Sequence, residues 1–160
     1  IPRDVRPAIG NRVFGCDICQ EVCPWNARFA SPSGDEAYAV ETPPHTLVEL
    51  ADRLLHLSEK GYRRLYANSP LARPKRKGML RNLLVGIGNA LASGAYGPDE
   101  HSTVIDVLER ALRDDQPLVR GHAAWALGQT DGGSSVLRQR AQVEADPFVR
   151  EEIEDAIASD

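Results

Sequence analysis

The sequence lacks long apolar runs and has few cysteines. Its apolar stretches, such as LLVGI at 83–87, are far shorter than the roughly 20 residues that a helix needs to cross a bilayer. No charged segment followed by an apolar one opens the chain, so we expect neither export nor insertion into a membrane. With 42% hydrophobic residues among 160, the chain can bury a core and is expected to be soluble and globular.

The scarcity of cysteine excludes another class of protein. Cys16, Cys19 and Cys23 are the only cysteines of the sequence, an odd number within eight positions. Thiols so close together do not form the long-loop disulfide framework of small secreted domains. A reducing, cytoplasmic setting is therefore expected.

The chain divides into two unlike parts. Residues 1–42 are rich in proline and contain the small, polar stretch SPSGDEA, which disfavours long helices. We expect this segment to be loop-rich and to depend on ligands or neighbours for its order. Because it opens with Ile1 in an extended, proline-containing stretch, we also expect that preceding sequence is missing. Residues 43–160 are predicted to form a helical domain, whose first helix starts in the stretch TPP at 42–44.

Apolar residues recur at helical spacing through the second part. Four stretches show this pattern, at 47–55, 62–66, 79–87 and 104–112. No alternation of apolar and polar residues of comparable length predicts a strand. The expected fold class is therefore all-α.

A motif recurs in the second part. DQPLVRGHAAWALGQT at 115–130 and ADPFVREEIEDAIASD at 145–160 share a proline, a Val-Arg pair and small or apolar positions at a period of 30, and LRNLLVGIGN at 80–89 matches more loosely. The proline starts a helix, the small residues pack, and the arginine can reach carboxylates or carbonyls of the adjoining turn. The pattern resembles the HEAT repeat, whose units stack into a right-handed solenoid because none buries its apolar face alone.

The cysteines match part of an iron–sulfur motif. In bacterial ferredoxins the run C-x2-C-x2-C-x3-C-P serves two 4Fe-4S clusters, and its last cysteine, before the proline, ligates the other cluster. Cys16, Cys19, Cys23 and Pro24 reproduce the last three cysteines and the proline, whereas Val13 stands in the first position. We therefore predict that Cys16 and Cys19 bind one 4Fe-4S cluster and Cys23 a second, with the other ligands supplied from outside this chain.

Two other interpretations of the cysteines compete with this one. A zinc site would need a fourth ligand such as His45 or His56, but structural zinc sites usually pair two separated knuckles and the sequence has one. Thiols without any ligand are common for a lone CxxC pair, but they do not account for a third cysteine followed by proline at ferredoxin spacing. The spacing favours iron–sulfur ligation.

The stretch RPAIGNRVFGCDICQEVCPWN at 6–26, followed by a HEAT-like tail, resembles the carboxy-terminal part of epoxyqueuosine reductase. The resemblance implies an oxidoreductase of queuosine biosynthesis that carries two 4Fe-4S clusters, passes electrons to a cobalamin in a larger amino-terminal domain, and reduces epoxyqueuosine in a tRNA anticodon. It implies that Cys16, Cys19 and Cys23 are cluster ligands. It also implies that the cobalamin pocket and the catalytic acid lie upstream, so the isolated chain is expected to be inactive.

An interpretation from a different class is a stand-alone HEAT-repeat adaptor. In that case the cysteine loop would bind a metal for structure, and the grooves between the helices would bind a protein. An upstream CxxCxxCxxxCP run in the parent gene would favour the reductase. A genuine start codon near Ile1 would favour the adaptor.

Basic residues are concentrated in one stretch, although the net charge of −4 excludes a general polyanion binder. Between Lys60 and Pro98 there are eight basic residues and no acidic one. The helix dipole disfavours cations at a helix start, so ARPKRKGMLRN at 72–82 indicates a binding use. A solvated helix face explains the charges equally well, and the resemblance favours RNA. We predict that five of these residues contact tRNA phosphates: Arg73, Lys75, Arg76, Lys77 and Arg81.

Several other conspicuous residues are expected to have structural roles. His122 and Trp125 lie three apart on an expected helix, where a packing aromatic with a polar neighbour is commoner than a cofactor site. Phe14, Val22 and Trp25 could shield the clusters, but we expect each to be a core residue that ties the cysteine loop to the helical body.

Overall fold

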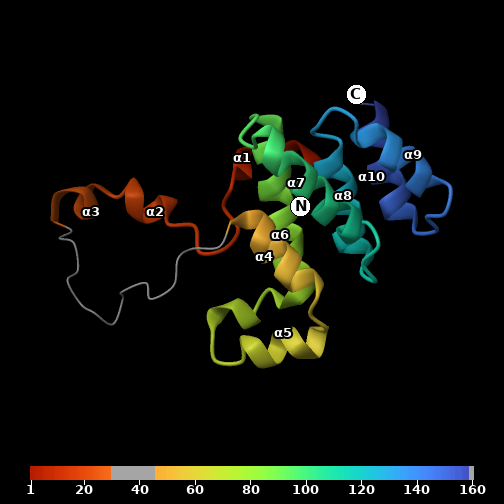
Figure 1. Cartoon of the computed structure of the whole chain (residues 1–160). Coiled ribbons are helices and arrows are strands. Elements are labelled where there is room, and N and C mark those ends of the chain that lie inside the picture. The colour runs from red at the N-terminus through yellow and green to blue at the C-terminus, as the bar shows by residue number, and fades with distance from the viewer. Residues whose placement is uncertain (30–45, 159–160) are drawn as a thin grey trace.

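The described chain is all-α. The structure is a computed structural model that describes residues 1–29 and 46–158, and within these ranges it contains no strand (Figure 1). The elements in chain order are η1 (Arg3–Val5), α1 (Arg6–Ile9), α2 (Ile18–Glu21), α3 (Pro24–Phe29), α4 (Leu47–Leu55), α5 (Glu59–Leu65), η3 (Pro70–Ala72), α6 (Lys75–Ala92), α7 (Pro98–Ala111), α8 (Pro117–Leu127), α9 (Gly133–Ala141) and α10 (Pro147–Ala158). The predicted fold class is confirmed. None of these helices is long and apolar enough to cross a bilayer.

The helical body opens with α4. The domain boundary predicted between 42 and 43 and the helix start predicted at 42–44 lie outside the described residues. The hydroxyl of Thr46 accepts a hydrogen bond from the backbone N–H of Glu49 (3.2 Å), and the Glu49 carboxylate accepts one from the N–H of Thr46 (2.8 Å). This reciprocal cap satisfies two N–H groups that lack partners within the helix.

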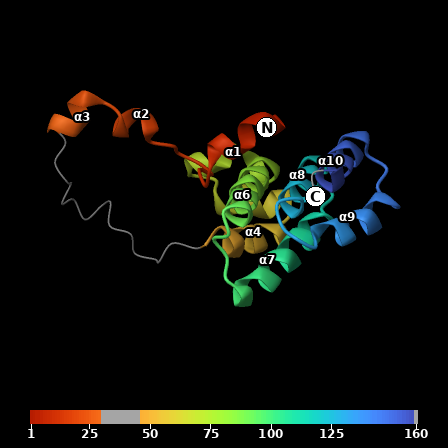
Figure 2. The same ribbon diagram turned by 90° about the horizontal axis from the view of Figure 1, so that it is seen from above.

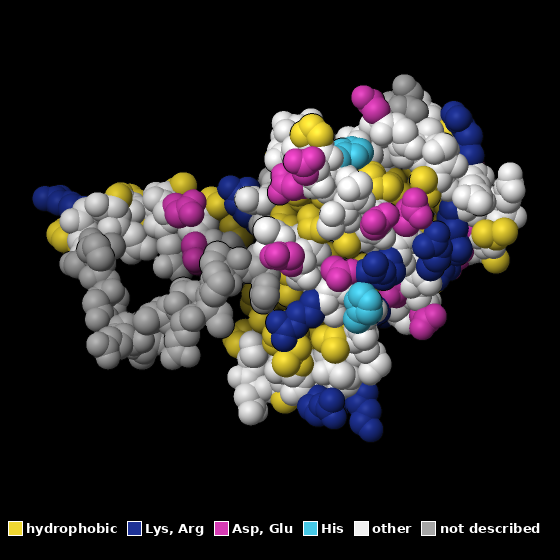
Figure 3. Space-filling view, in the orientation of Figure 1, with side chains coloured by type: hydrophobic (Ala, Val, Ile, Leu, Met, Phe, Trp, Pro, Cys, Tyr) yellow, Lys and Arg dark blue, Asp and Glu magenta, His cyan; other side chains and the backbone are white. Residues whose placement is uncertain are grey.

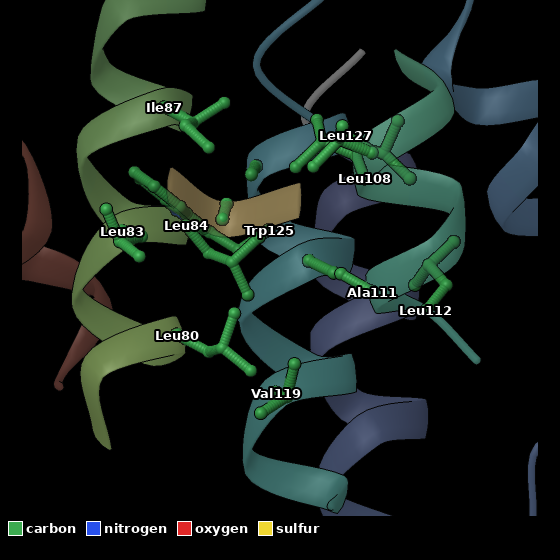
Figure 4. Close-up of a cluster of buried hydrophobic side chains, with 14 of the residues drawn as sticks. Leu80, Leu83, Leu84, Ile87, Leu108, Ala111, Leu112, Val119, Trp125 and Leu127 are labelled. Atoms are coloured by element: carbon green, nitrogen blue, oxygen red, sulfur yellow. The ribbon is translucent and has the colours of Figure 1, made fainter. Parts of the chain in front are cut away.

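The core lies between α6 and the helices that pack around it. Helix α8 packs against α6, α7 and α10, while α6 also contacts α4 and α5. Figure 4 shows side chains of α6 meeting those of α8, with side chains of α7 on the other side of α8, and Leu80, Leu83, Leu84 and Ile87 of α6 are fully buried. Burial of each such side chain stabilises the fold by about 2 kcal/mol, so this interface is a large part of the hydrophobic driving force.

Two glycines show that the repeated sequence motif corresponds to a repeated contact between helices. A methyl group at Gly88 would lie 2.5 Å from Cζ3 of Trp125, so the absence of a side chain lets α8 approach α6. Gly128 is its counterpart in the next repeat, and a methyl group there would lie 2.8 Å from Cβ of Ala156 on α10. Successive helices α6, α8 and α10 are therefore joined by the same close contact.

The first 29 residues form two segments that differ in whether they pack against the helical body. Residues 1–14, which we call the N-terminal strap, pack against the helical body, with α1 lying against α6. Residues 15–29, which we call the cysteine arm, carry α2 and α3 away from the body in both views (Figures 1 and 2). The strap therefore decides where the arm starts.

Candidate functional site

The cysteine arm displays its three thiols. Cys16 and Cys19 are exposed, Cys23 is half-buried, and none is in a disulfide. Gly15 has φ +69°, a conformation that side chains disfavour, and it turns the chain out of the strap immediately before Cys16. Cys19 lies on α2 and Cys23 directly precedes α3, so the ferredoxin-like spacing folds as two short helices.

Apolar side chains of the arm are also exposed, which corrects one expectation. Val22 and Trp25 are 72% and 71% exposed, so they do not tie the cysteine loop to the helical body. Trp25 instead stacks on Phe29, with ring centroids 5.5 Å apart. Phe14, the last residue of the strap, does pack against the core. The anchoring therefore ends where the arm begins.

The arm fits part of a metal site and not a whole one. Within the ranges that the structure describes, no group of three or more His, Cys, Asp or Glu side chains is placed to hold one metal ion. The soft thiolate donors suit iron–sulfur clusters, and their exposure leaves them accessible to ligands from elsewhere. His56, considered as a zinc ligand, caps the end of α4 with Nδ1 2.9 Å from the carbonyl of Asp52. His45 lies outside the described residues.

Two asparagines of α6 hold the strap. The side-chain amide of Asn89 donates to the carbonyls of Arg6 (2.9 Å) and Gly10 (2.8 Å), and that of Asn82 donates to the carbonyl of Val13 (2.8 Å). Because the bonds go to backbone carbonyls, they fix the course of the chain rather than one side chain. The last bond holds the peptide three residues before Cys16.

A buried ion pair joins the strap to α10. The guanidinium of Arg6 donates to both carboxylate oxygens of Glu152, at 2.8 and 2.6 Å, and the two residues are 1% and 3% exposed. The same guanidinium lies 5.2 Å from the ring centre of Trp125. Burial alone would raise the pKa of Glu152, but hydrogen bonds from Arg6 and Arg3 outweigh it and hold this pKa below its ordinary value.

His122 lies near this ion pair and has a structural role, as expected. It is 1% exposed, and its Nδ1 donates to the carbonyl of Leu118 (2.8 Å). Its Nε2 is buried without a hydrogen-bond partner. Burial, aided by the charge of Arg6, lowers the pKa of His122 to about 4, so the ring is neutral at pH 7.

The five residues predicted to contact tRNA do not share one surface. Lys75 and Lys77 are exposed, whereas Arg76 between them is 9% exposed. Arg73 is exposed and its guanidinium lies 5.6 Å from the ring centre of Phe14. The remaining residue, Arg81, is half-buried and hydrogen-bonded to the adjacent Asn82.

The exposed lysines join a residue from another helix. Lys75 and Lys77 line a cavity of about 550 Å³ together with Arg63 of α5, Glu59 and Gln116. Lys and Arg side chains gather over α5 in the space-filling view (Figure 3). We call Arg63, Lys75 and Lys77 the cationic surface. Its position at the α5–α6 corner would suit contact with a phosphate backbone.

Helix α5 is held in place by its one buried aromatic residue. The hydroxyl of Tyr62 donates to the carbonyl of Leu71 (2.6 Å), which ties α5 to the segment that leads into α6. Burial raises the pKa of Tyr62 to about 12. Arg63, next to it, is thereby brought beside Lys75.

Comparison with known proteins shows which proteins this chain resembles. A HEAT-repeat family matches residues 87–158. Epoxyqueuosine reductase from Pseudomonas aeruginosa is 43% identical over 129 residues, which cover 79% of this chain and 32% of that protein. The enzyme from Bacillus anthracis is 30% identical over 155 residues, which cover 96% of this chain and 38% of that protein. The resemblance to epoxyqueuosine reductase is confirmed.

Solved structures extend the likeness to the whole chain. An epoxyqueuosine reductase in complex with an epoxyqueuosine-modified tRNA-Tyr stem loop matches with a TM-score of 0.73 and 25% identity, covering 99% of this chain and 40% of the other. The enzyme from Bacillus subtilis matches with a TM-score of 0.72 and 26% identity, covering the same shares. This chain thus spans about a third of the length of the curated epoxyqueuosine reductases, such as the 32% of the Pseudomonas enzyme.

In the part shared with epoxyqueuosine reductases, sequence reasoning missed two groups of residues. Arg63 was counted among the basic residues but not assigned to the site, because it lies on another helix. Asn82, Asn89 and the Arg6–Glu152 pair carried no signal, since asparagine, arginine and glutamate are ordinary surface residues in a sequence.

Proposed function

We propose that this chain is the cluster-ligating and RNA-binding part of an epoxyqueuosine reductase, a cobalamin-dependent oxidoreductase that converts epoxyqueuosine to queuosine in tRNA. The observation that carries the proposal is the likeness, over 99% of the chain, to an epoxyqueuosine reductase solved with its modified tRNA stem loop. The cobalamin and the catalytic groups would be supplied by a partner domain outside this chain. The cysteine arm and the cationic surface are the two sites that this chain contributes.

The cysteine arm would contribute thiolates to two clusters. Cys16 and Cys19 would bind one 4Fe-4S cluster and Cys23 the other, with the remaining thiolates supplied from outside the chain. When bound, such clusters supply one-electron transfer. The free, accessible state of the thiols supports this assignment. The role of Asn82 and Asn89 is to hold the strap so that the arm leaves the body at a defined point.

The cationic surface would bind the phosphate backbone of tRNA near the anticodon. Lys75, Lys77 and Arg63 are exposed and share one cavity, so an incoming phosphate can meet more than one positive charge. Arg73 is exposed as well and could extend the contact toward the strap. Such contacts add affinity through counterion release and position the RNA without reading its sequence.

Metal analysis tests the cluster assignment. The complete protein, purified without oxygen, is expected to contain iron and labile sulfide equivalent to two 4Fe-4S clusters. Cys16→Ser and Cys23→Ser should each impair a different cluster, seen as the loss of different signals in electron paramagnetic resonance. Val22→Ser changes a residue of the same arm that is not a ligand. It is the control and should leave the signals of both clusters unchanged. Stoichiometric zinc with no iron would overturn the assignment and favour the HEAT-repeat adaptor.

Salt-dependent binding tests the RNA surface. Lys75→Glu, Lys77→Glu and Arg63→Glu in the complete protein should each weaken binding of a tRNA stem loop. Each lost phosphate contact should flatten the plot of log affinity against log salt by about 0.7 to 0.9. Arg138→Glu makes the same charge change at an exposed site on α9 and should have little effect. Equal losses of affinity in Arg138→Glu and Lys75→Glu would show that the variants act through the net charge of the protein and would contradict a specific RNA-binding surface.

A further inference from the structure

Arg76 makes three hydrogen bonds in the interior. Its Nε donates to the carbonyl of Leu54 (3.0 Å) and its Nη2 to the carbonyl of Leu55 (3.2 Å), the last two residues of α4. Nη2 also donates to Oδ2 of Asp114 (2.6 Å), whose side chain is 5% exposed. A positive charge at the carboxyl end of a helix is favourable, so α4 and Asp114 offset the unfavourable position of Arg76 at the start of α6.

Arg120 repeats this arrangement one helical unit later. Its Nη1 donates to the carbonyls of Asp114 (2.9 Å) and Asp115 (3.2 Å), which follow the end of α7. Its Nε and Nη2 donate to the two carboxylate oxygens of Glu144, at 2.9 and 2.8 Å, and the side chain of Glu144 is 2% exposed.

The two carboxylates also occupy equivalent places. Oδ1 of Asp114 accepts from the backbone N–H of Gln116 (2.9 Å), immediately before α8. Oε1 of Glu144 accepts from the N–H of Asp146 (3.0 Å), immediately before α10. In each case an arginine of one repeat holds the chain that leads into the next repeat. We call the pairs Arg76–Asp114 and Arg120–Glu144 the arginine ladder.

The Arg76–Asp114 pair also affects the two residues beside Arg76 in the sequence, Lys75 and Lys77. Lys75 has φ +59°, a left-handed backbone that is unfavourable for a lysine and persists only where the surrounding structure holds it. Lys77 follows Arg76 and shares the same cavity as Lys75. Since successive side chains in a helical turn point in different directions, an inward Arg76 leaves both lysines outward.

We infer that Arg76 is a positioning residue, which presents Lys75 and Lys77 to RNA by locking the start of α6 to α4 and Asp114, and that it makes no phosphate contact itself. The inference rests on the proposed function of the cationic surface. Arg76 is 9% exposed, and its Nε and Nη2 are engaged by protein partners. Arg120 forms the equivalent rung, and its carboxylate partner is Glu144.

Asp114→Asn distinguishes positioning from direct contact. The change removes a negative charge and leaves the charge of Arg76, so simple electrostatics predicts tighter binding of a tRNA stem loop to the complete protein. Positioning predicts weaker binding, because without the Arg76–Asp114 ion pair the start of α6 is held only by the two bonds to α4, and contacts of Lys75 and Lys77 are weakened or lost. Loss of both contacts would flatten the salt dependence by between about 1.4 and 1.8. Tighter or unchanged binding by Asp114→Asn would overturn the inference.

A background lacking the lysines provides the second arm of the test. Arg76→Met should weaken RNA binding in the otherwise unchanged protein and have no further effect in Lys75→Ala/Lys77→Ala protein. A further flattening by about 0.7 to 0.9 in that background would make Arg76 a phosphate ligand and overturn the inference. Arg76→Lys, which keeps the charge but lacks the guanidinium fork, should bind RNA as weakly as Arg76→Met.

Glu144→Gln is the matched control. It makes the same charge change as Asp114→Asn in the equivalent rung but leaves Arg120 and its bonds to the Asp114 and Asp115 carbonyls in place, so it should lower stability without weakening RNA binding. A loss of RNA affinity in Glu144→Gln equal to that in Asp114→Asn would assign the effect to general destabilisation and overturn the inference. If Lys75→Ala/Lys77→Ala itself leaves RNA binding unchanged, the proposed surface fails. If that double variant weakens binding but Asp114→Asn does not, only the role of Arg76 fails.

Discussion

The N-terminal strap and the cysteine arm are adjacent in sequence, yet they are held in opposite ways. The strap is anchored by Asn82, Asn89 and the buried Arg6–Glu152 pair. The arm, by contrast, has two exposed cysteines, Cys16 and Cys19, and an exposed Trp25–Phe29 stack. The difference teaches that an irregular segment is ordered here where polar side chains of distant helices hold its backbone and where its apolar residues, such as Ile9 and Phe14, also reach the core. Four variants test this comparison.

The largest effect is expected at the ion pair that anchors the strap. Glu152→Ala leaves the buried charge of Arg6 without its partner, which should lower the free energy of unfolding by about 3 to 5 kcal/mol. Urea denaturation followed by circular dichroism measures it. Glu151→Ala, an exposed neighbour on the same helix, is the control and should change little. Equal losses in the two variants would contradict the assigned role of the pair.

A pH-dependent effect is expected next, at His122 beside the same ion pair. Its folded pKa of about 4 lies below the unfolded value of about 6.5, so the unfolded chain binds more protons between these values. Stability is therefore full above about pH 6.5 and falls by about 3 kcal/mol as the pH drops to about 4. Denaturation at several pH values should show this slope, and His122→Gln should flatten it. An unchanged slope in the variant would assign it to other groups.

A moderate effect is expected at the asparagine that holds the strap at two points. Asn89→Ala leaves the carbonyls of Arg6 and Gly10 without their side-chain donor, at a cost of about 1 to 3 kcal/mol. Asn26→Ala removes a similar bond, to the carbonyl of Gln20, within the exposed arm. The free energy of unfolding of the Asn26→Ala variant should match that of the unchanged chain. A larger loss of unfolding free energy in Asn26→Ala than in Asn89→Ala would contradict the view that the strap is anchored and the arm is not.

The smallest effect is expected from the aromatic stack of the arm. Trp25 is 71% exposed, so Trp25→Ala should change the free energy of unfolding of this chain by no more than about 0.5 kcal/mol. Thermal unfolding followed by circular dichroism measures it, and Trp125→Ala, in the core, gives the contrasting large loss. A loss above about 1 kcal/mol for Trp25→Ala would show that the arm is anchored after all.

Sequence reasoning was accurate where the feature is local. Helical spacing and the proline at a helix start depend on residues close together in the chain, and with the recurring motif they predicted the all-α repeat fold. The likeness to epoxyqueuosine reductase could be recognised for the same reason, from one continuous stretch at 6–26. The assignment of Cys16, Cys19 and Cys23 to two clusters stays a prediction.

Residues that look alike in the sequence were separated only by their partners. Lys75, Arg76 and Lys77 form one run of positive charge, but Arg76 is held by α4 and by Asp114, 38 residues away. Val22 and Trp25 were expected in the core because they are apolar, yet the arm that carries them leaves the body. An apolar side chain favours burial, but it is buried only where the path of the chain brings it against the core.

The sequence by itself determined the helices of the second part, the recurrence of their HEAT-like motif and the spacing of the cysteines, because propensity, capping and motif spacing act over a few neighbouring residues. Only the tertiary structure decided that Arg6 meets Glu152, 146 residues away, that Asn89 of α6 holds the strap, and that Arg63 joins Lys75. The physical reason is that an ion pair or a hydrogen bond depends on distances of about 3 Å, and these are set by the packing of whole helices.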